Sequence, residues 1–231
     1  MFIFEEAIKC GDVLKQRTQE RSINGKYEQV LALFLEGSVR TLKAINVLYD
    51  TEFYEEGFSL IRILLEVGVD LEYINLDKVK LAEQYFEFAN LKSNKQADRL
   101  KDLNVPLSSE ERYSINLQFK NDLKWSQKTF GEMLEKILLN KKTEKDWFIV
   151  TYKFLCDFSH PSALGLGATV AFTKEEITVK ARYRENLKEA LPVLSCHLAM
   201  GIFLIINEEF HLSTSPQIKQ IMAEIGKLAG K

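Results

Sequence analysis

Apolar side chains recur at intervals of three and four residues along the first third of the chain. Over 26–49 the repeat includes Val30, Leu31, Phe34, Leu35, Leu42, Ile45 and Leu48. This period predicts amphipathic helices, and the same pattern predicts helices over 2–20 and 54–75. Only 4 prolines and 11 glycines interrupt the 231 residues, which favours long helices over a sheet with many turns. We therefore expect an all-α bundle of about seven helices.

The rest of the chain fits this architecture, with one exception. A charged middle, 77–146, is expected to form roughly two or three amphipathic helices whose charges lie in solvent. Further helices are expected from about Thr143 to His160, over about 185–210, and from about residue 216. In "ATVAFTKEEITVKARY" apolar and polar residues alternate, which predicts a small β-hairpin insertion near 168–183. No internal repeat is visible, so we expect a single helical domain over 1–231.

The composition is typical of a soluble globular protein and argues against a general nucleic-acid binder. Hydrophobic residues make up 46% and charged residues 28% of the chain, and the formal net charge is −2. Cys10, Cys156 and Cys196 lie far apart and form no CxxC pair. They are expected to be buried free thiols in a reducing cytoplasm. The start, "MFIFEEAIK", lacks the basic residues and long apolar core of a signal peptide.

The most hydrophobic segment is "ALPVLSCHLAMGIFLII", residues 190–206. It is interrupted by Pro192, Ser195 and His197, and it is shorter than the ~20 apolar residues that a membrane helix needs. We expect a central buried helix, bent near Pro192, and no membrane contact. His197 is expected to be a satisfied core histidine, and His211 is expected to lie at the surface near a helix end.

A polar stripe runs along the otherwise apolar segment 54–75. Ser59, Arg62, Glu66 and Asp70 are spaced by three, four and four residues, which places them on one face of a helix. Arginine and glutamate are rarely buried unless paired. We therefore predict that Arg62 and Glu66 hydrogen-bond. A salt bridge with a purely structural role is the alternative, and removing one partner of a buried pair costs about 3–5 kcal/mol.

The stretch "CDFSHPSALGLGA", residues 156–168, is expected to end a helix at His160, because the residue before a proline is pushed out of the helical region. The helix-end carbonyls and Asp157 favour a protonated His160, which could act as an acid or a base. Ser159 could donate a hydrogen bond to an anion. We expect His160 to meet Arg62 and Glu66 in a polar pocket. The alternative is that His160 has a structural role only, at the end of the helix.

A metal site made of Glu66, Asp157 and His160 fits in ligand type, but no HExxH or similar spacing supports it. We therefore expect no metal and no cofactor.

Three stretches together resemble a family of uncharacterised bacterial helical proteins known only as a domain of unknown function. They are "LFLEGSVRTLKAINVLYD", "EGFSLIRILLEVGVDLEYI" and "YKFLCDFSHPS". The family's pattern has an R-x-x-x-E helix and a later helix with a tyrosine followed by Ser-His. The positions here are Arg62, Glu66, Tyr152, Ser159 and His160. The resemblance implies a helical fold and no established activity.

A more distant resemblance is to HEPN-type domains, helical bundles that include RNA-cleaving toxins and phage-defence proteins. In those nucleases an arginine precedes a histidine by roughly five to seven positions, steadying the phosphate while the histidine handles the 2′-hydroxyl proton. Lys153, Phe154 and Leu155 stand upstream of His160 here, with no arginine among them. Arg62 would have to come from another helix.

Three functions stay open, and the sequence does not decide whether the protein is an enzyme. In the first, a cytoplasmic protein binds a small anionic ligand or a nucleotide in a polar pocket of the bundle. In the second, a HEPN-like enzyme cleaves RNA with Arg62, Glu66 and His160. In the third, the protein is a non-catalytic interaction module, and a homodimer is left open. The candidate ligand-binding residues are Arg62, Glu66, Tyr152, Asp157, Ser159 and His160.

Overall fold

The computed structural model describes residues 2–89, 125–139, 141–159, 170–172, 177–179 and 181–229. These residues contain eight helices, and the expected all-α architecture is confirmed. The labelled helices are α1 (Phe2–Gln19), α2 (Lys26–Asp50), α3 (Tyr54–Asn75), α5 (Phe130–Leu138), α6 (Lys142–Ser159), α8 (Ala181–Phe210) and α9 (Ser215–Ala229). A further helix covers 78–89. The helices expected over 2–20, 26–49 and 54–75 agree with α1, α2 and α3 to within a residue.

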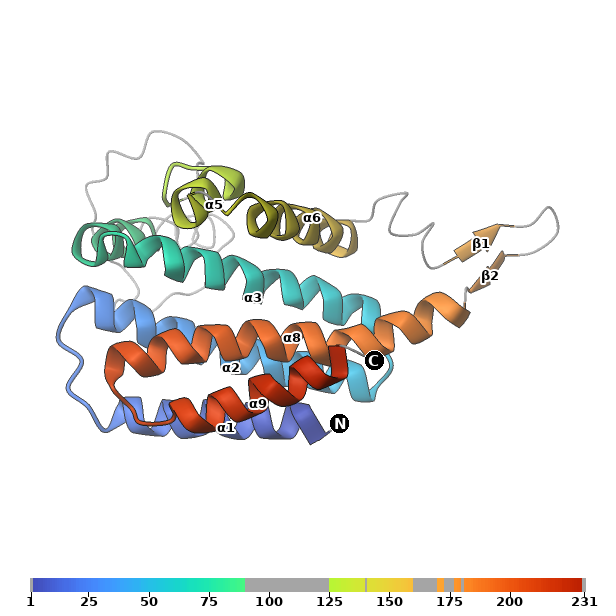
Figure 1. Cartoon of the computed structure of the whole chain (residues 1–231), viewed down its shortest axis with the longest axis horizontal. Helices are drawn as coiled ribbons and strands as arrows, with labels where there is room; N and C mark the ends of the chain where they lie inside the picture. The colour runs from blue at the N-terminus through green and yellow to red at the C-terminus, as the bar shows by residue number, and fades with distance from the viewer. Residues whose placement is uncertain are drawn as a thin grey trace, which may run out of the picture.

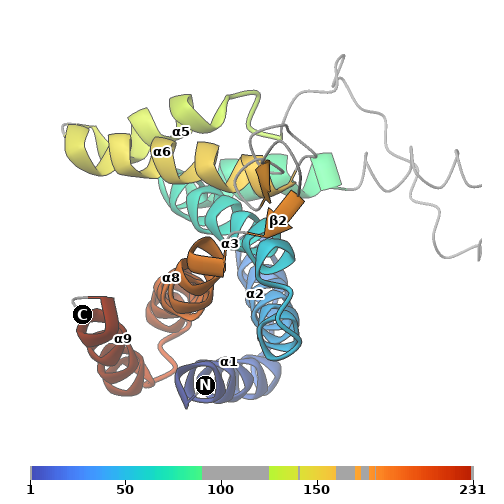
Figure 2. The ribbon, with the colours of Figure 1, turned by 90° about the vertical axis from the view of Figure 1, so that its right-hand side faces the viewer.

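Helix α3 lies in the middle of the helical layers. Figure 1 shows α5 and α6 on one side of α3, with α8 and α2 on the other side and α1 and α9 beyond them. The end view in Figure 2 shows the same order. Helix α3 packs against α2, α8, α6 and α5, and α8 packs against α1, α2 and α9. The core is built from fully buried side chains of these helices, such as Phe4, Leu42, Phe58 and Phe203.

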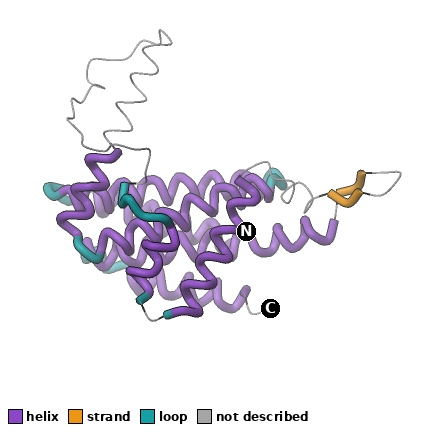
Figure 3. The backbone as a smooth tube through the Cα atoms, turned by 90° about the horizontal axis from the view of Figure 1, so that it is seen from above, coloured by secondary structure: helices purple, strands orange, loops and turns teal. Residues whose placement is uncertain are grey.

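Two short strands lie beyond the helices. Val170–Phe172 (β1) and Ile177–Val179 (β2) pair antiparallel, with Val170 opposite Val179. Figure 3 shows them beyond one end of the helical body. Residues 160–169 and 173–176 lie outside the described residues, so the hairpin insertion over 168–183 stays a prediction. The same holds for most of the charged middle, because 90–124 are not described.

Helix α8 is one continuous helix of 30 residues that contains Pro192. By its length and composition alone, the part Glu185–Phe210 is apolar enough to cross a membrane. A buried core helix meets the same criterion, and Leu191, Cys196, Met200 and Phe203 of α8 are buried.

Two arginines, Arg17 of α1 and Arg21 just after it, contact the carboxyl end of α8 and the turn that follows it. The guanidinium of Arg17 donates to the carbonyl oxygen of Leu212, and that of Arg21 donates to the carbonyl oxygen of Phe210. Cations at this end of a helix offset its negative partial charge and satisfy carbonyls that have no partner within the helix. These contacts hold the turn between α8 and α9 against α1.

Candidate functional site

Arg62, Glu66 and Tyr152 form a closed triangle of hydrogen bonds between α3 and α6. Arg62 Nε donates to Glu66 Oε1 at 3.1 Å, which confirms the expected pair. Arg62 Nη2 donates to the Tyr152 hydroxyl at 3.3 Å, and that hydroxyl donates to Glu66 Oε1 at 3.1 Å. The i,i+4 spacing puts Arg62 and Glu66 on one face of α3, and α6 packs on that face. The triangle therefore fixes how α6 sits on α3.

The ring of Tyr152 lies between a cation and an aromatic ring. The Arg62 guanidinium carbon is 5.3 Å from its centroid, and the Phe130 ring stacks on it with centroids 4.1 Å apart. Burial, followed by the nearby Glu66 carboxylate, raises the pKa of the Tyr152 phenol to about 12. The phenol therefore stays protonated at neutral pH and acts as a hydrogen-bond donor to Glu66.

The triangle is only partly buried, although it lies on an otherwise apolar helix. The Arg62 and Glu66 side chains are 22% and 33% exposed, and the neighbouring Ile63 is 45% exposed. Helix α3 packs against α2, α5, α6 and α8, but solvent still reaches the Arg62 and Glu66 side chains. The apolar composition of α3 therefore did not imply that all of its side chains are buried.

The other candidate residues lie at the end of α6. The Ser159 hydroxyl donates to the carbonyl oxygen of Leu155 at 3.1 Å, within its own helix. Asp157 is half-buried. The Ser59 hydroxyl donates to the carbonyl oxygen of Phe158 at 2.7 Å and so ties this end of α6 to α3. His160 lies outside the described residues, so its convergence with Arg62 and Glu66 stays a prediction.

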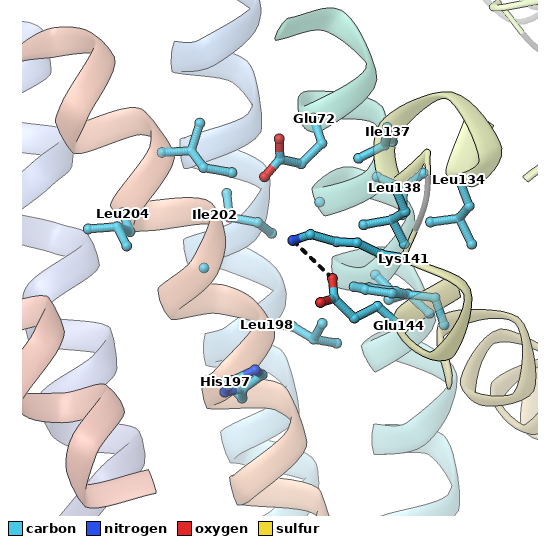
Figure 4. Close-up of a pocket in the computed structure, with 16 residues that line it drawn as sticks. Glu72, Leu134, Ile137, Leu138, Lys141, Glu144, His197, Leu198, Ile202 and Leu204 are labelled. Atoms are coloured by element: carbon cyan, nitrogen blue, oxygen red, sulfur yellow. Dashed lines mark ion pairs between the residues drawn. The ribbon is translucent and has the colours of Figure 1, made fainter. Parts of the chain in front are cut away.

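A separate cavity of about 400 Å³ lies between four helices, and we call it the interhelical cavity. Its walls come from Leu65 and Val69 of α3, Leu134 and Ile137 of α5, Phe148 of α6, and Leu198 and Ile202 of α8. Figure 4 shows these side chains around a common space. The walls are largely apolar, as is usual in pockets that take organic ligands.

Charged side chains gather at one part of the interhelical cavity. Lys141, which precedes α6, forms an ion pair with Glu144 at 3.3 Å, and the Glu72 carboxylate of α3 lies on the other side of the Lys141 ammonium (Figure 4). The apolar surroundings raise the pKa of the Glu72 carboxyl, and the charge of Lys141 opposes that effect. His197 also lines the cavity and is exposed, so the prediction that it is a core histidine was wrong.

Two glycines line the cavity from facing helices, Gly68 on α3 and Gly201 on α8. A Cβ added to Gly201 would meet no atom within 4 Å, and one added to Gly68 would meet only Ile202, at 3.8 Å. The missing side chains therefore leave room in the cavity.

The sequence did not reveal the interhelical cavity, because its walls come from four separate segments. The one available signal was an interruption of apolar helices by small or polar residues, at Gly68 and at Gly201 with His197. His211 is exposed and follows the end of α8, as expected.

All three cysteines are free, with Cys10 and Cys196 buried and Cys156 half-buried. Among the described residues there is no group of three His, Cys, Asp or Glu side chains placed to hold a metal ion.

Comparisons with known proteins give one match. A search of curated proteins and a search of solved structures found no significant similarity. A family model matches residues 28–177, which span α2, α3, α5 and α6 and include Arg62, Glu66, Tyr152 and His160. Helix α8, the remaining wall of the interhelical cavity, lies outside the match. Because the match covers more than half of the 231 residues, the chain belongs to the family of unknown function DUF5677.

Proposed function

We propose that the protein binds a small organic molecule in the interhelical cavity. The observation that carries this proposal is the cavity itself, about 400 Å³ in volume, with apolar walls from α3, α5, α6 and α8 and charged groups in one place. Ligand pockets are commonly about 300–1,000 Å³ and combine apolar walls with a few polar groups that orient the ligand. We thus still propose a ligand site inside the bundle, but we place it in the interhelical cavity and not at the triangle of Arg62, Glu66 and Tyr152.

An anionic ligand at Arg62 has weaker support. The guanidinium already donates to the Glu66 carboxylate and the Tyr152 hydroxyl, and the carboxylate offsets its charge. An incoming anion would have to compete with Glu66, which lies on the same helix. The triangle suits a structural role better, because it joins α3, α6 and, through Phe130, α5.

The remaining expectations stay predictions of the sequence. RNA cleavage of the HEPN type depends on His160, which lies outside the described residues. We also propose a bacterial, cytoplasmic protein, and the three free cysteines support a reducing compartment. Self-association has one supporting feature, since Trp147, Val150 and Phe154 are exposed along one side of α6.

The test uses a neutral fluorescent probe of apolar cavities, N-phenyl-1-naphthylamine. We expect the wild-type protein to bind it with enhanced fluorescence. Gly201→Leu should abolish the enhancement, because its side chain enters the space that Gly201 leaves open. Leucine also favours a helix interior over glycine, by about 0.5–1 kcal/mol, so the variant is expected to fold.

Gly226→Leu is the matched control. Gly226 lies in α9, does not line the cavity, and has no atom within 4 Å of an added Cβ. The proposal requires normal probe binding in this variant, and circular dichroism should show the same helix content in all three proteins. Equal probe binding by wild type and Gly201→Leu would refute a binding site in the interhelical cavity.

A further inference from the structure

We infer that the ligand of the interhelical cavity is an organic cation: an apolar body that carries an ammonium or similar positive head. This inference rests on the proposed function and adds the chemical class of the ligand. It follows from two properties of the cavity, the composition of its walls and the signs of the charges at one part of them.

The walls determine the body of the ligand. Leu65, Leu134, Ile137, Phe148 and Ile202 offer no hydrogen-bonding side-chain groups, so an apolar group gains by leaving water there and a polar one loses its hydration. A volume of about 400 Å³ corresponds to about thirteen water molecules at about 30 Å³ each. A short aliphatic chain or an aromatic ring system fits that space.

The charges determine the head. Two carboxylates, Glu72 and Glu144, line the cavity together with one lysine, Lys141. Lys141 pairs with Glu144 at 3.3 Å and its charge also acts on Glu72, so one cation serves two carboxylates and the three side chains leave one negative charge in excess. His197 lies lower in the cavity, on α8 (Figure 4). A cationic head beside Glu72 would supply a second positive charge for the two carboxylates, which now share Lys141.

An anionic head fits poorly for the same reason. A ligand carboxylate that approached Lys141 would meet Glu144 and Glu72, which lie on either side of the ammonium (Figure 4). Repulsion between like charges weakens the binding of a ligand, and proteins commonly use it to reject the wrong one. The charge pattern therefore selects against fatty acids and other organic anions.

The experiment compares three ligands with one body and different heads: octylammonium, octan-1-ol and octanoate. Each displaces N-phenyl-1-naphthylamine from the full chain at neutral pH and low salt. We expect octylammonium to displace the probe at a concentration about five to tenfold below that of octanol, with octanoate the weakest. Octanoate equal to or better than octylammonium would overturn the inference, while displacement as such would leave the proposed function standing.

The variant Glu72→Gln tests whether Glu72 causes the preference for octylammonium over octanol. It should reduce the advantage of octylammonium over octanol to roughly twofold or less and leave octanol unchanged. Glu56→Gln is the control, because Glu56 is exposed on the same helix about 24 Å from Glu72 at 1.5 Å per residue. An unchanged preference in Glu72→Gln would overturn the role of that carboxylate. Failure of the probe to bind wild type would instead count against the proposed function.

Discussion

The ring of Phe130 stacks on the ring of Tyr152, with centroids 4.1 Å apart and planes inclined by 14°. Phe130 is the first residue of α5, and Tyr152 lies in the middle of α6, where its hydroxyl contacts Arg62 and Glu66 of α3. One aromatic pair therefore joins three helices. Because α5 and α6 also supply walls of the interhelical cavity, the stack and the triangle hold part of the cavity in place.

Replacing Phe130 by alanine tests this joint. Phe130 is 6% exposed, so the truncation removes a buried aromatic ring, and we expect a loss of about 3 kcal/mol in the free energy of unfolding measured with urea. Val79→Ala is the control, since Val79 is 79% exposed and should change stability by less than about 0.5 kcal/mol. A Phe130→Ala protein as stable as the control would show that α5 is not held through this stack.

A double-mutant cycle on Arg62 and Glu66, with alanine at each position, measures their coupling. Solvent reaches both side chains, so we expect about 1 kcal/mol rather than the cost of a fully buried pair. The i,i+3 pair Glu6–Lys9, with Lys9 64% exposed, is the reference and should give a smaller coupling, because solvent screens it more fully. Equal coupling in the two pairs would argue against a structural role for the triangle.

The phenol of Tyr152 makes stability depend on pH in the alkaline range. Its pKa is raised to about 12 in the folded protein, against about 10 in the unfolded chain. Between these values the folded state holds a proton that the unfolded state has lost, so this contribution to stability falls as pH rises. Tyr152→Phe should lessen the fall between about pH 9 and about pH 11 by about 1 kcal/mol, after discounting for solvent screening.

Urea unfolding at both pH values provides that measurement. Burial also raises the pKa of Tyr85 to about 12, and Tyr85 titrates equally in both proteins, so it cancels in the comparison. The same fall in wild type and Tyr152→Phe would contradict the protonated, donating phenol.

The three thiols should differ in reactivity. Burial raises the pKa of Cys10 to about 11 and that of Cys196 to about 12, so both stay protonated and shielded near neutral pH. Cys156 is half-buried and should react first. A native-state titration with a disulfide reagent should give one fast thiol, which Cys156→Ser removes. Denaturation without reductant should release three thiols, and finding only one would reveal a disulfide.

RNA cleavage is expected to be absent or weak, because the positions before His160 carry no arginine. Labelled single-stranded RNA incubated with the protein without metal should remain intact. Robust cleavage that His160→Ala abolishes would instead support the HEPN-like alternative, and Lys142→Ala, at the exposed start of α6, serves as the surface control.

Local patterns in the sequence predicted the local structure well. The i,i+4 spacing of Arg62 and Glu66 was enough to predict their hydrogen bond, since both partners lie on one helix face. The apolar period placed α3 at its observed bounds because nothing inside that segment interrupts a helix. The helix expected over about 185–210 is part of α8, which runs through Pro192 without a break, and the bend expected there stays a prediction.

Features that depend on how distant helices meet were not predicted. His197 lies in an apolar segment, but it faces the interhelical cavity rather than the core, and only the positions of α5 and α6 decide that. Lys141 and Glu144 belonged to a charged stretch that was interpreted as a solvated face. They are exposed, as expected, but they also border the cavity with Glu72, which lies about seventy positions earlier.

The arginine caps at the carboxyl end of α8 have a consequence for the order of folding. Arg17 binds the backbone of a residue 195 positions later, and α1 packs against both α8 and α9. Contacts between such distant residues close long loops and form slowly. During synthesis, α1 has no lasting partner in α8 or α9 until residues 181–229 have emerged from the ribosome. Until then its apolar side, including Phe4, Ala7 and Leu14, is not covered by α8 or α9 and offers a chaperone apolar surface.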